Sequence, residues 1–173
     1  TDMSYLFSYT NLEIGVFNED ISLWDVSNVK NMDGMFLNCN YFNQSLNLWN
    51  VSNVESMRSM FEGCEHFNEP LDSWDVSKVK NMNFMFAYCL IFNQSLNLWN
   101  VSNVIKMNYT FLNCINFDNS LYLWNVEKVK NMKGMFEGCH SFNQPLESWN
   151  ISKKKTHYMF AYCFNFNQNL DKW

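Results

Sequence analysis

Glycine and proline are scarce in this sequence, whose 173 residues include only five glycines and two prolines. This scarcity argues against a glycine-rich phosphate loop, which needs several glycines close together. No apolar run approaches the ~18 residues that mark a membrane-spanning helix. The net charge of −5 also lacks the basic excess that is typical of nucleic-acid-binding proteins. We therefore expect no nucleic-acid partner and no membrane span in this segment.

Motifs for catalysis and metal binding are missing too. The sequence contains no His-Glu-x-x-His motif and no Cys-x-x-Cys pair. The three histidines, His66, His140 and His157, fall at different places in the pattern described below. We therefore predict that the protein is not an enzyme and uses neither a metal nor another cofactor.

The start of the chain shows no signal peptide, and its first residue is Thr1 rather than methionine. We expect the chain to be a mature form or an excised piece of a longer protein. A basic run, Lys153–Lys155, is interpreted as a solvated surface segment rather than as a phosphate site.

Aromatic residues are abundant, at 18% of the chain, and they recur with a fixed period. Cysteine and two phenylalanines keep the same period as tryptophan. A repeat of about 25 residues predicts a solenoid, in which each repeat is one coil that buries its apolar face against its neighbours. The tryptophans, spaced by 25 residues and at the end by 24, are Trp24, Trp49, Trp74, Trp99, Trp124, Trp149 and Trp173.

Within one coil, the apolar pattern changes from a period of two to a period near three. The alternation over Trp49–Val51 predicts a short strand. The apolar positions over Val54–Cys64 predict a short helix, with Ser52 as its capping residue. Residues tolerant of positive φ follow where the helix should end, namely Asn38, Gly63, Asn113 and Gly138.

The predicted fold class is therefore an α/β solenoid of the leucine-rich-repeat type, with one short parallel strand and one short helix per 25-residue coil. Residues 1–173 should form a single domain. We expect a degenerate first coil over residues 1–23, five regular coils over residues 24–148 and an irregular last coil over residues 149–173. The six cysteines should be small core residues, without disulfides or metal. One asparagine recurs in each coil and forms a column broken only by Asp118. These side chains should lie inside and form hydrogen bonds with the backbone of the loops. The asparagines are Asn43, Asn68, Asn93, Asn143 and Asn167.

The pattern W-[DN]-V-S-N-V-x-x-M-x-x-M-F-x-x-C-x-x-F-N-Q-x-L resembles the tandem repeat of the BspA-like leucine-rich-repeat proteins of bacterial cell surfaces. The resemblance covers roughly residues 17–173, with departures at Thr110, Glu127 and Thr156. It implies a repeat module exposed at the cell surface or outside the cell, with adhesion or protein binding as its role. The family has no catalytic residues to carry over.

Two coils carry outward apolar residues where other coils carry polar ones. Scattered apolar surface residues are common on any protein, so a contact patch and an ordinary surface are both open interpretations. A weaker candidate is the outward row formed by Leu23, Leu48, Leu98 and Leu123. The predicted binding residues are Phe84, Tyr88, Leu90, Ile91, Ile105, Tyr109, Leu112 and Ile115.

The leading hypothesis is a non-catalytic repeat module that presents a surface for protein–protein interaction or adhesion. The alternative hypothesis is a structural solenoid that associates with copies of itself into a larger assembly. The expected partner is accordingly another protein or a second copy of this chain.

Overall fold

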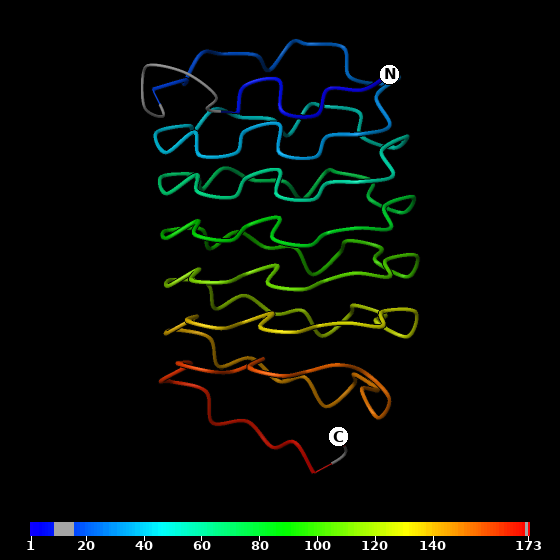
Figure 1. Ribbon diagram of the computed structural model, residues 1–173, viewed down its shortest axis with the longest axis vertical. Helices are drawn as coiled ribbons and strands as arrows, with labels where there is room; N and C mark the ends of the chain where they lie inside the picture. Colours follow the sequence, from blue (N-terminus) through cyan, green and yellow to red (C-terminus); the bar gives the residue numbers. More distant parts are fainter. Residues whose placement is uncertain (9–15, 172) are drawn as a thin grey trace.

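The protein is a stack of coils whose order follows the sequence, with the N-terminus at one end and the C-terminus near the other (Figure 1). The computed structural model describes residues 1–8, 16–171 and 173. Residues 9–15, which belong to the predicted degenerate coil 1–23, lie outside the described residues. Neighbouring coils are joined by isolated parallel β-bridges. These are Asp2–Asn31, Asn31–Ser56, Ser56–Asn81, Asn81–Lys106, Lys106–Asn131 and Asn131–Lys155.

The predicted fold class is wrong. Over the described residues no helix forms, and β-structure is limited to the single bridging residue in each coil. The coils stack as the repeat indicates, but they are neither α/β nor of the leucine-rich-repeat type. Each coil is built from turns.

The segment predicted as a helix is a series of overlapping turns. In the coil that begins at Trp49, the amides of Met60, Glu62 and Cys64 each donate to the carbonyl three residues earlier, at 3.3, 3.2 and 2.9 Å. Ser59 and Gly63 have φ values of +54° and +76°, which a right-handed helix does not allow. The positive φ expected at Asn38, Gly63, Asn113 and Gly138 is confirmed, although no helix precedes them.

The alternate amides of this segment bond to the next coil. Met57, Ser59, Phe61 and Gly63 donate to carbonyls 24 residues later, at 2.8–3.0 Å. A helix would use these amides internally, four residues back along the chain. Here they tie each coil to its neighbour. We call this segment the ladder.

The predicted strand at Trp49–Val51 is also wrong, because these residues form no strand and lead directly into a turn at residues 52–53. The side-chain oxygen of Asn50 accepts a bond from the Ser52 amide at 3.2 Å, and the Val54 amide donates to the Val51 carbonyl at 2.9 Å. Ser52 therefore contributes its backbone amide to an Asx turn, and it caps no helix. Because only the backbone is needed, Glu127 fits the same place, donating to Asn125 at 3.0 Å.

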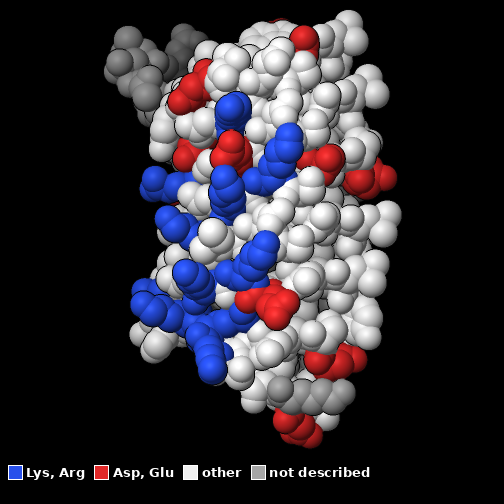
Figure 2. Space-filling view, turned by 90° about the vertical axis from the view of Figure 1, so that its right-hand side faces the viewer, with Lys and Arg blue, Asp and Glu red and all other residues white. Residues whose placement is uncertain are grey.

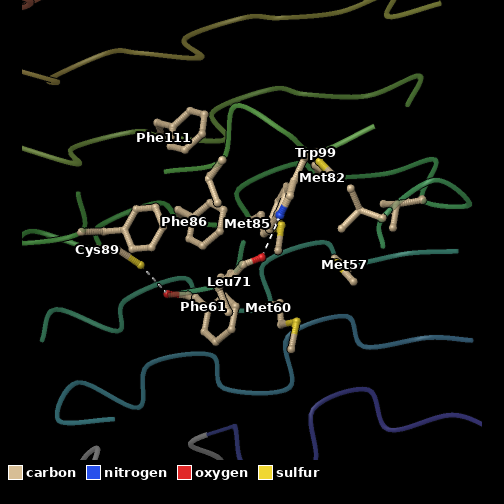
Figure 3. Close-up of a cluster of buried hydrophobic side chains, with 14 of the residues drawn as sticks. Met57, Met60, Phe61, Leu71, Met82, Met85, Phe86, Cys89, Trp99 and Phe111 are labelled. Atoms are coloured by element: carbon tan, nitrogen blue, oxygen red, sulfur yellow. Dashed lines mark hydrogen bonds between the residues drawn. The ribbon is translucent and has the colours of Figure 1, made fainter. Parts of the chain in front are cut away.

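The core consists of aromatic rings that stack from coil to coil (Figure 3). Phe86 lies 5.7 Å from Phe61 and 5.6 Å from Phe111, measured between ring centroids. Polar atoms that enter the core are satisfied across coils: the Trp99 indole donates to the Leu71 carbonyl at 2.9 Å, and the Cys89 thiol donates to the Phe61 carbonyl at 3.0 Å. Each coil thus buries the aromatic rings of the preceding coil and bonds to its backbone carbonyls.

Thr110 occupies a place that other coils give to methionine, and it fits the core without leaving a polar atom unpaired. It is fully buried, and its hydroxyl contacts the carbonyls of Met82 and Met107 at 3.1 and 2.9 Å. In the last coil, Thr156 takes the other methionine place, that of Met132, and is only half-buried.

The asparagine column bonds neighbouring coils as predicted, but it lies at the surface rather than inside. The Asn43 side chain accepts from the Asn68 amide, and the Asn68 side chain accepts from the Asn93 amide, at 2.9 and 2.8 Å. Asp118 continues the column, because its carboxylate accepts the Asn143 amide at 2.8 Å. The position requires an acceptor oxygen, which asparagine and aspartate both supply.

Candidate binding surfaces

The described residues contain no group of three or more His, Cys, Asp or Glu side chains arranged to hold a metal ion. The same part of the chain has no helix that is long and apolar enough to cross a membrane. All six cysteines are free. Burial raises the pKa of Cys39 and of Cys163 to about 11, and it raises the pKa of the other four thiols further. These thiols are therefore neutral at neutral pH, where a nucleophile or a metal ligand would be a thiolate.

The structure brings several of the predicted binding residues together but leaves few of them exposed. Phe84 and Tyr109 stack with their ring centroids 5.0 Å apart, and both are half-buried. Leu90, Leu112 and Ile115 are also half-buried. Tyr88 and Ile91 are 43% and 41% exposed. These two side chains are the accessible part of the group.

Ile105 lies among the lysines of the neighbouring coils. Its amide donates to the Lys80 carbonyl at 2.9 Å, and its carbonyl accepts from the Lys130 amide at 3.0 Å. Its side chain, 36% exposed, lies between two lysine positions of the adjacent coils. Tyr109, another of the predicted residues, also lies beside a lysine: the Lys133 ammonium is 5.6 Å from the centroid of its ring.

The weaker candidate surface, the outward row of leucines, is more exposed than the eight predicted binding residues. Leu23, Leu48, Leu98 and Leu123 occupy the same place in four coils, immediately before the tryptophan. Their side chains are 90%, 78%, 78% and 59% exposed. Ser73 and Ser148 take this place in the other two coils, so the fold does not require leucine there. We call these four residues the leucine row.

A third surface is basic, and sequence reasoning missed it. Eleven of the twelve Lys and Arg residues lie four to nine residues after a tryptophan, so stacking brings them to one edge. Figure 2 shows them as a band along the length of the stack. From Trp74 onward this part of each coil contains nine lysines and no acidic residue. We call these nine the lysine strip: Lys78, Lys80, Lys106, Lys128, Lys130, Lys133, Lys153, Lys154 and Lys155.

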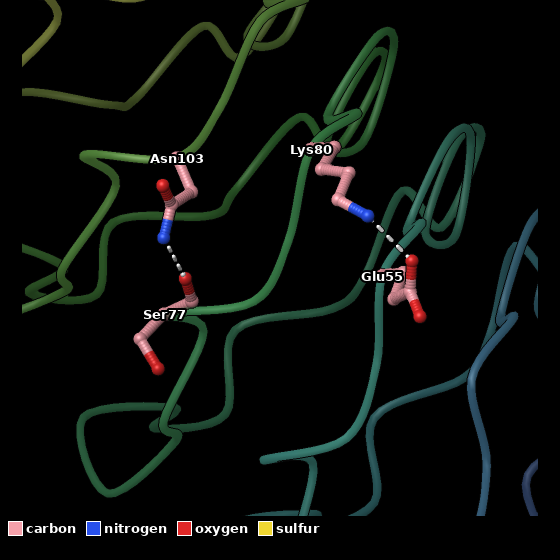
Figure 4. Close-up of polar contacts among 4 residues, drawn as sticks. All are labelled: Glu55, Ser77, Lys80 and Asn103. Carbon is pink, nitrogen blue, oxygen red and sulfur yellow. Dashed lines mark hydrogen bonds and ion pairs between the residues drawn. The ribbon is translucent and has the colours of Figure 1, made fainter.

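Few of these lysines have a carboxylate partner. The described residues contain one ion pair, between Lys80 and Glu55 at 2.6 Å (Figure 4). The Lys128 ammonium donates to the Asn103 side chain at 2.7 Å, and Asn103 in turn donates to the Ser77 carbonyl at 2.8 Å. Lys154 donates to two backbone carbonyls, and burial lowers its pKa. Most of the positive charge therefore faces solvent without compensation.

The overall charge of −5 conceals this strip. Residues 1–75 contain twelve of the seventeen acidic residues and two of the twelve basic ones, whereas residues 76–173 contain five and ten. The signal was present in the sequence, since aligning the coils on tryptophan superimposes the lysines. The lysine strip was not predicted because Lys153–Lys155 was interpreted as an isolated run.

The protein-family model described as "Mycoplasma protein of unknown function, DUF285" matches the chain over residues 1–120 and again over residues 92–173. The two matches together span the whole chain. This chain belongs to the DUF285 family. The DUF285 description assigns no activity, and the narrower resemblance to BspA-like surface proteins is not part of this match. No curated protein and no solved structure matches the chain.

Proposed function

We propose that this chain is a non-catalytic repeat module of a cell-surface protein, and that it presents a binding surface for protein–protein interaction or adhesion. The observation that carries this proposal is the leucine row, in which four leucines in equivalent places are 59–90% exposed. A single exposed leucine needs no explanation, but a regular row of them is typical of an interaction surface.

The coil spacing makes the row suitable for binding. Leu98 and Leu123 lie in adjacent coils, and neighbouring coils joined by β-bridges are about 4.8 Å apart. The stacked core fixes these positions before a partner arrives, so little conformational entropy is lost on binding. Burying each leucine against a partner would contribute about 1.5–3 kcal/mol.

The location at the cell surface rests on the resemblance of the repeat to that of BspA-like bacterial surface proteins. The free, buried cysteines require neither an oxidising nor a reducing compartment, so they do not bear on the location.

Self-association is the second candidate function, and the same row favours it. Two pairs of leucines in adjacent coils, Leu23 with Leu48 and Leu98 with Leu123, could pack against the same pairs on another copy in a two-fold symmetric contact. Sedimentation velocity over a range of concentrations separates the two functions. A module that binds other proteins should stay monomeric, whereas an assembly element should sediment faster as its concentration rises.

The double variant Leu98→Ser/Leu123→Ser tests the proposal. Serine already occupies the same place at Ser73 and Ser148, so the fold should tolerate both changes. Beads coated with the wild-type chain should adhere to cultured cells or to matrix proteins, and beads coated with the variant should lose most of that adhesion. The measurement is the number of bound beads relative to albumin-coated beads.

The matched control is Ser73→Ala/Ser148→Ala, which alters the same place in two other coils without removing a leucine. This control should adhere like the wild type. Wild-type beads that bind no better than albumin-coated beads, together with a monomeric wild-type protein, would contradict both candidate functions.

A further inference from the structure

We propose that the lysine strip is a second docking surface, and that its partner is an acidic peptide segment that places an apolar side chain between its carboxylates. This inference rests on the proposed binding function, but it uses residues outside the leucine row. A failure of one surface can therefore be distinguished from a failure of the other.

The backbone holds one column of the strip in strict register. The amide of Ile105 donates to the Lys80 carbonyl, the amide of Lys130 donates to the Ile105 carbonyl, and the amide of Lys155 donates to the Lys130 carbonyl, at 2.9, 3.0 and 3.3 Å. Successive members of this column are therefore about one strand spacing, 4.8 Å, apart. The order along the stack is lysine, isoleucine, lysine, lysine.

The same column borders a shallow groove with an apolar floor. Ile105 and Val129 lie in this groove. Its other lining residues are five lysines and one carboxylate, namely Lys128, Lys130, Lys153, Lys154, Lys155 and Glu127. A second hollow at Ile105 is lined by Lys78, Lys80, Lys128, Asn103 and Glu55, whose carboxylate pairs with Lys80. Ile105 thus lies between two hollows lined mostly by lysines, where an apolar side chain of a partner can contact it.

The charges of the strip are arranged for a partner rather than for the fold. Lys128 and Lys153 occupy the same place in adjacent coils, and the Lys155 amide bonds to the Lys130 carbonyl, so like charges lie at short range. Within the described residues, no carboxylate pairs with any of these four lysines. Like charges held together repel each other, and an anionic partner relieves that repulsion.

The shape and charge of the strip favour an acidic peptide over other anions. A polysaccharide or a nucleic-acid backbone presents charge without an aliphatic group to fill the space over Ile105. A long polyanion would also extend over the N-terminal coils, where twelve acidic residues oppose two basic ones. A second copy is disfavoured because its acidic residues are spread over many places in the coil, from Asp25 and Asp75 after the tryptophan to Glu62 and Glu65 near the ladder end.

Fluorescence anisotropy with labelled peptides tests the inference on the whole chain. The probe is a peptide of about twelve residues made of Glu-Glu-Leu triplets, and its comparison is an equally long peptide of Glu-Glu-Ser triplets. The leucine peptide should bind more tightly, and raising the salt from about 20 to about 300 mM should weaken both complexes, since screening acts on the charged contacts. Lys128→Glu/Lys130→Glu should weaken binding about tenfold or more.

Two matched controls locate the contact. Lys30→Glu/Arg58→Glu makes the same change in net charge at the equivalent edge of the N-terminal coils, and it should change the affinity less than about twofold. Ile105→Ser should abolish the preference for the leucine peptide, whereas Ile91→Ser, at a comparably exposed isoleucine, should preserve it.

Several results would overturn the inference. These are no binding of either peptide at low salt, equal losses for the two double-charge variants, or an unchanged leucine preference in Ile105→Ser. Tighter binding of a heparin oligosaccharide or of phosphatidylserine vesicles than of the leucine peptide would assign the strip to a different partner class. Retained adhesion by Lys128→Glu/Lys130→Glu beads would leave the leucine-row proposal intact whichever result is obtained.

Discussion

Replacing Phe61 with alanine is expected to lower the free energy of unfolding by about 3–5 kcal/mol. Phe61 is fully buried, and its ring centroid lies 5.5 Å from that of Phe36, 5.7 Å from that of Phe86 and 4.3 Å from that of Phe67. Removing the ring interrupts a stack that continues through neighbouring coils. The rigid ladder on either side cannot collapse to fill the cavity. Urea denaturation followed by tryptophan fluorescence measures the loss.

The control for this prediction is the next residue. Glu62 is only half-buried, and its backbone carbonyl, which alanine retains, accepts the Asn38 amide at 2.7 Å. Glu62→Ala should therefore change the free energy of unfolding by no more than about 0.5 kcal/mol. Similar denaturation midpoints for the two variants would refute the assignment of Phe61 to the core.

Replacing Gly63 with alanine is expected to cost about 2–3 kcal/mol, although it adds only one methyl group. Gly63 has a φ of +76°, in which an added Cβ is strained. That Cβ would also lie 2.4 Å from the side-chain oxygen of Asn38 and 3.2 Å from its Cα, so the neighbouring coil would have to move. Thermal and urea denaturation of the variant measure the cost.

A double-variant cycle separates the two causes of this loss. Asn38→Ala removes the side-chain oxygen but leaves the φ of Gly63 and the Cα of residue 38 in place. In that background, Gly63→Ala should cost roughly 1–2 kcal/mol, the part that the backbone conformation causes. An unchanged cost in the Asn38→Ala background would show that Asn38 does not obstruct the position.

The sequence predicted the stacking and the core well because both depend on periodicity. Phe61, Cys64 and Trp74 recur in every regular coil, and a residue that recurs in this way is buried by its copies in the next coil. The predicted binding residues are less well placed, because exposure depends on neighbours in the stack. Tyr109 illustrates this point: its ring lies against Gly134 of the next coil, where an added Cβ would be 2.3 Å away.

The helix was predicted wrongly for a physical reason. Apolar residues three or four apart, such as Met57, Met60, Phe61 and Cys64, occupy one face of a helix, but they also occupy one face of overlapping turns. The positive φ values at Ser59 and Gly63 distinguish the two structures. A glycine in a sequence indicates that a positive φ is possible, whereas a serine, phenylalanine or tyrosine gives no such indication. Ser59, Phe84 and Tyr109 all adopt positive φ at the same place in successive coils.

The central claim is that the ladder amides bond the coils to one another rather than forming a helix within each coil. Scalar coupling across hydrogen bonds, measured by NMR, tests this claim directly at Phe86. The structure places the Phe86 amide 2.9 Å from the Thr110 carbonyl of the next coil. A coupling between the Phe86 nitrogen and the Thr110 carbonyl carbon is therefore predicted. A coupling to the Met82 carbonyl carbon, four residues earlier, would be the helical result and would contradict the account.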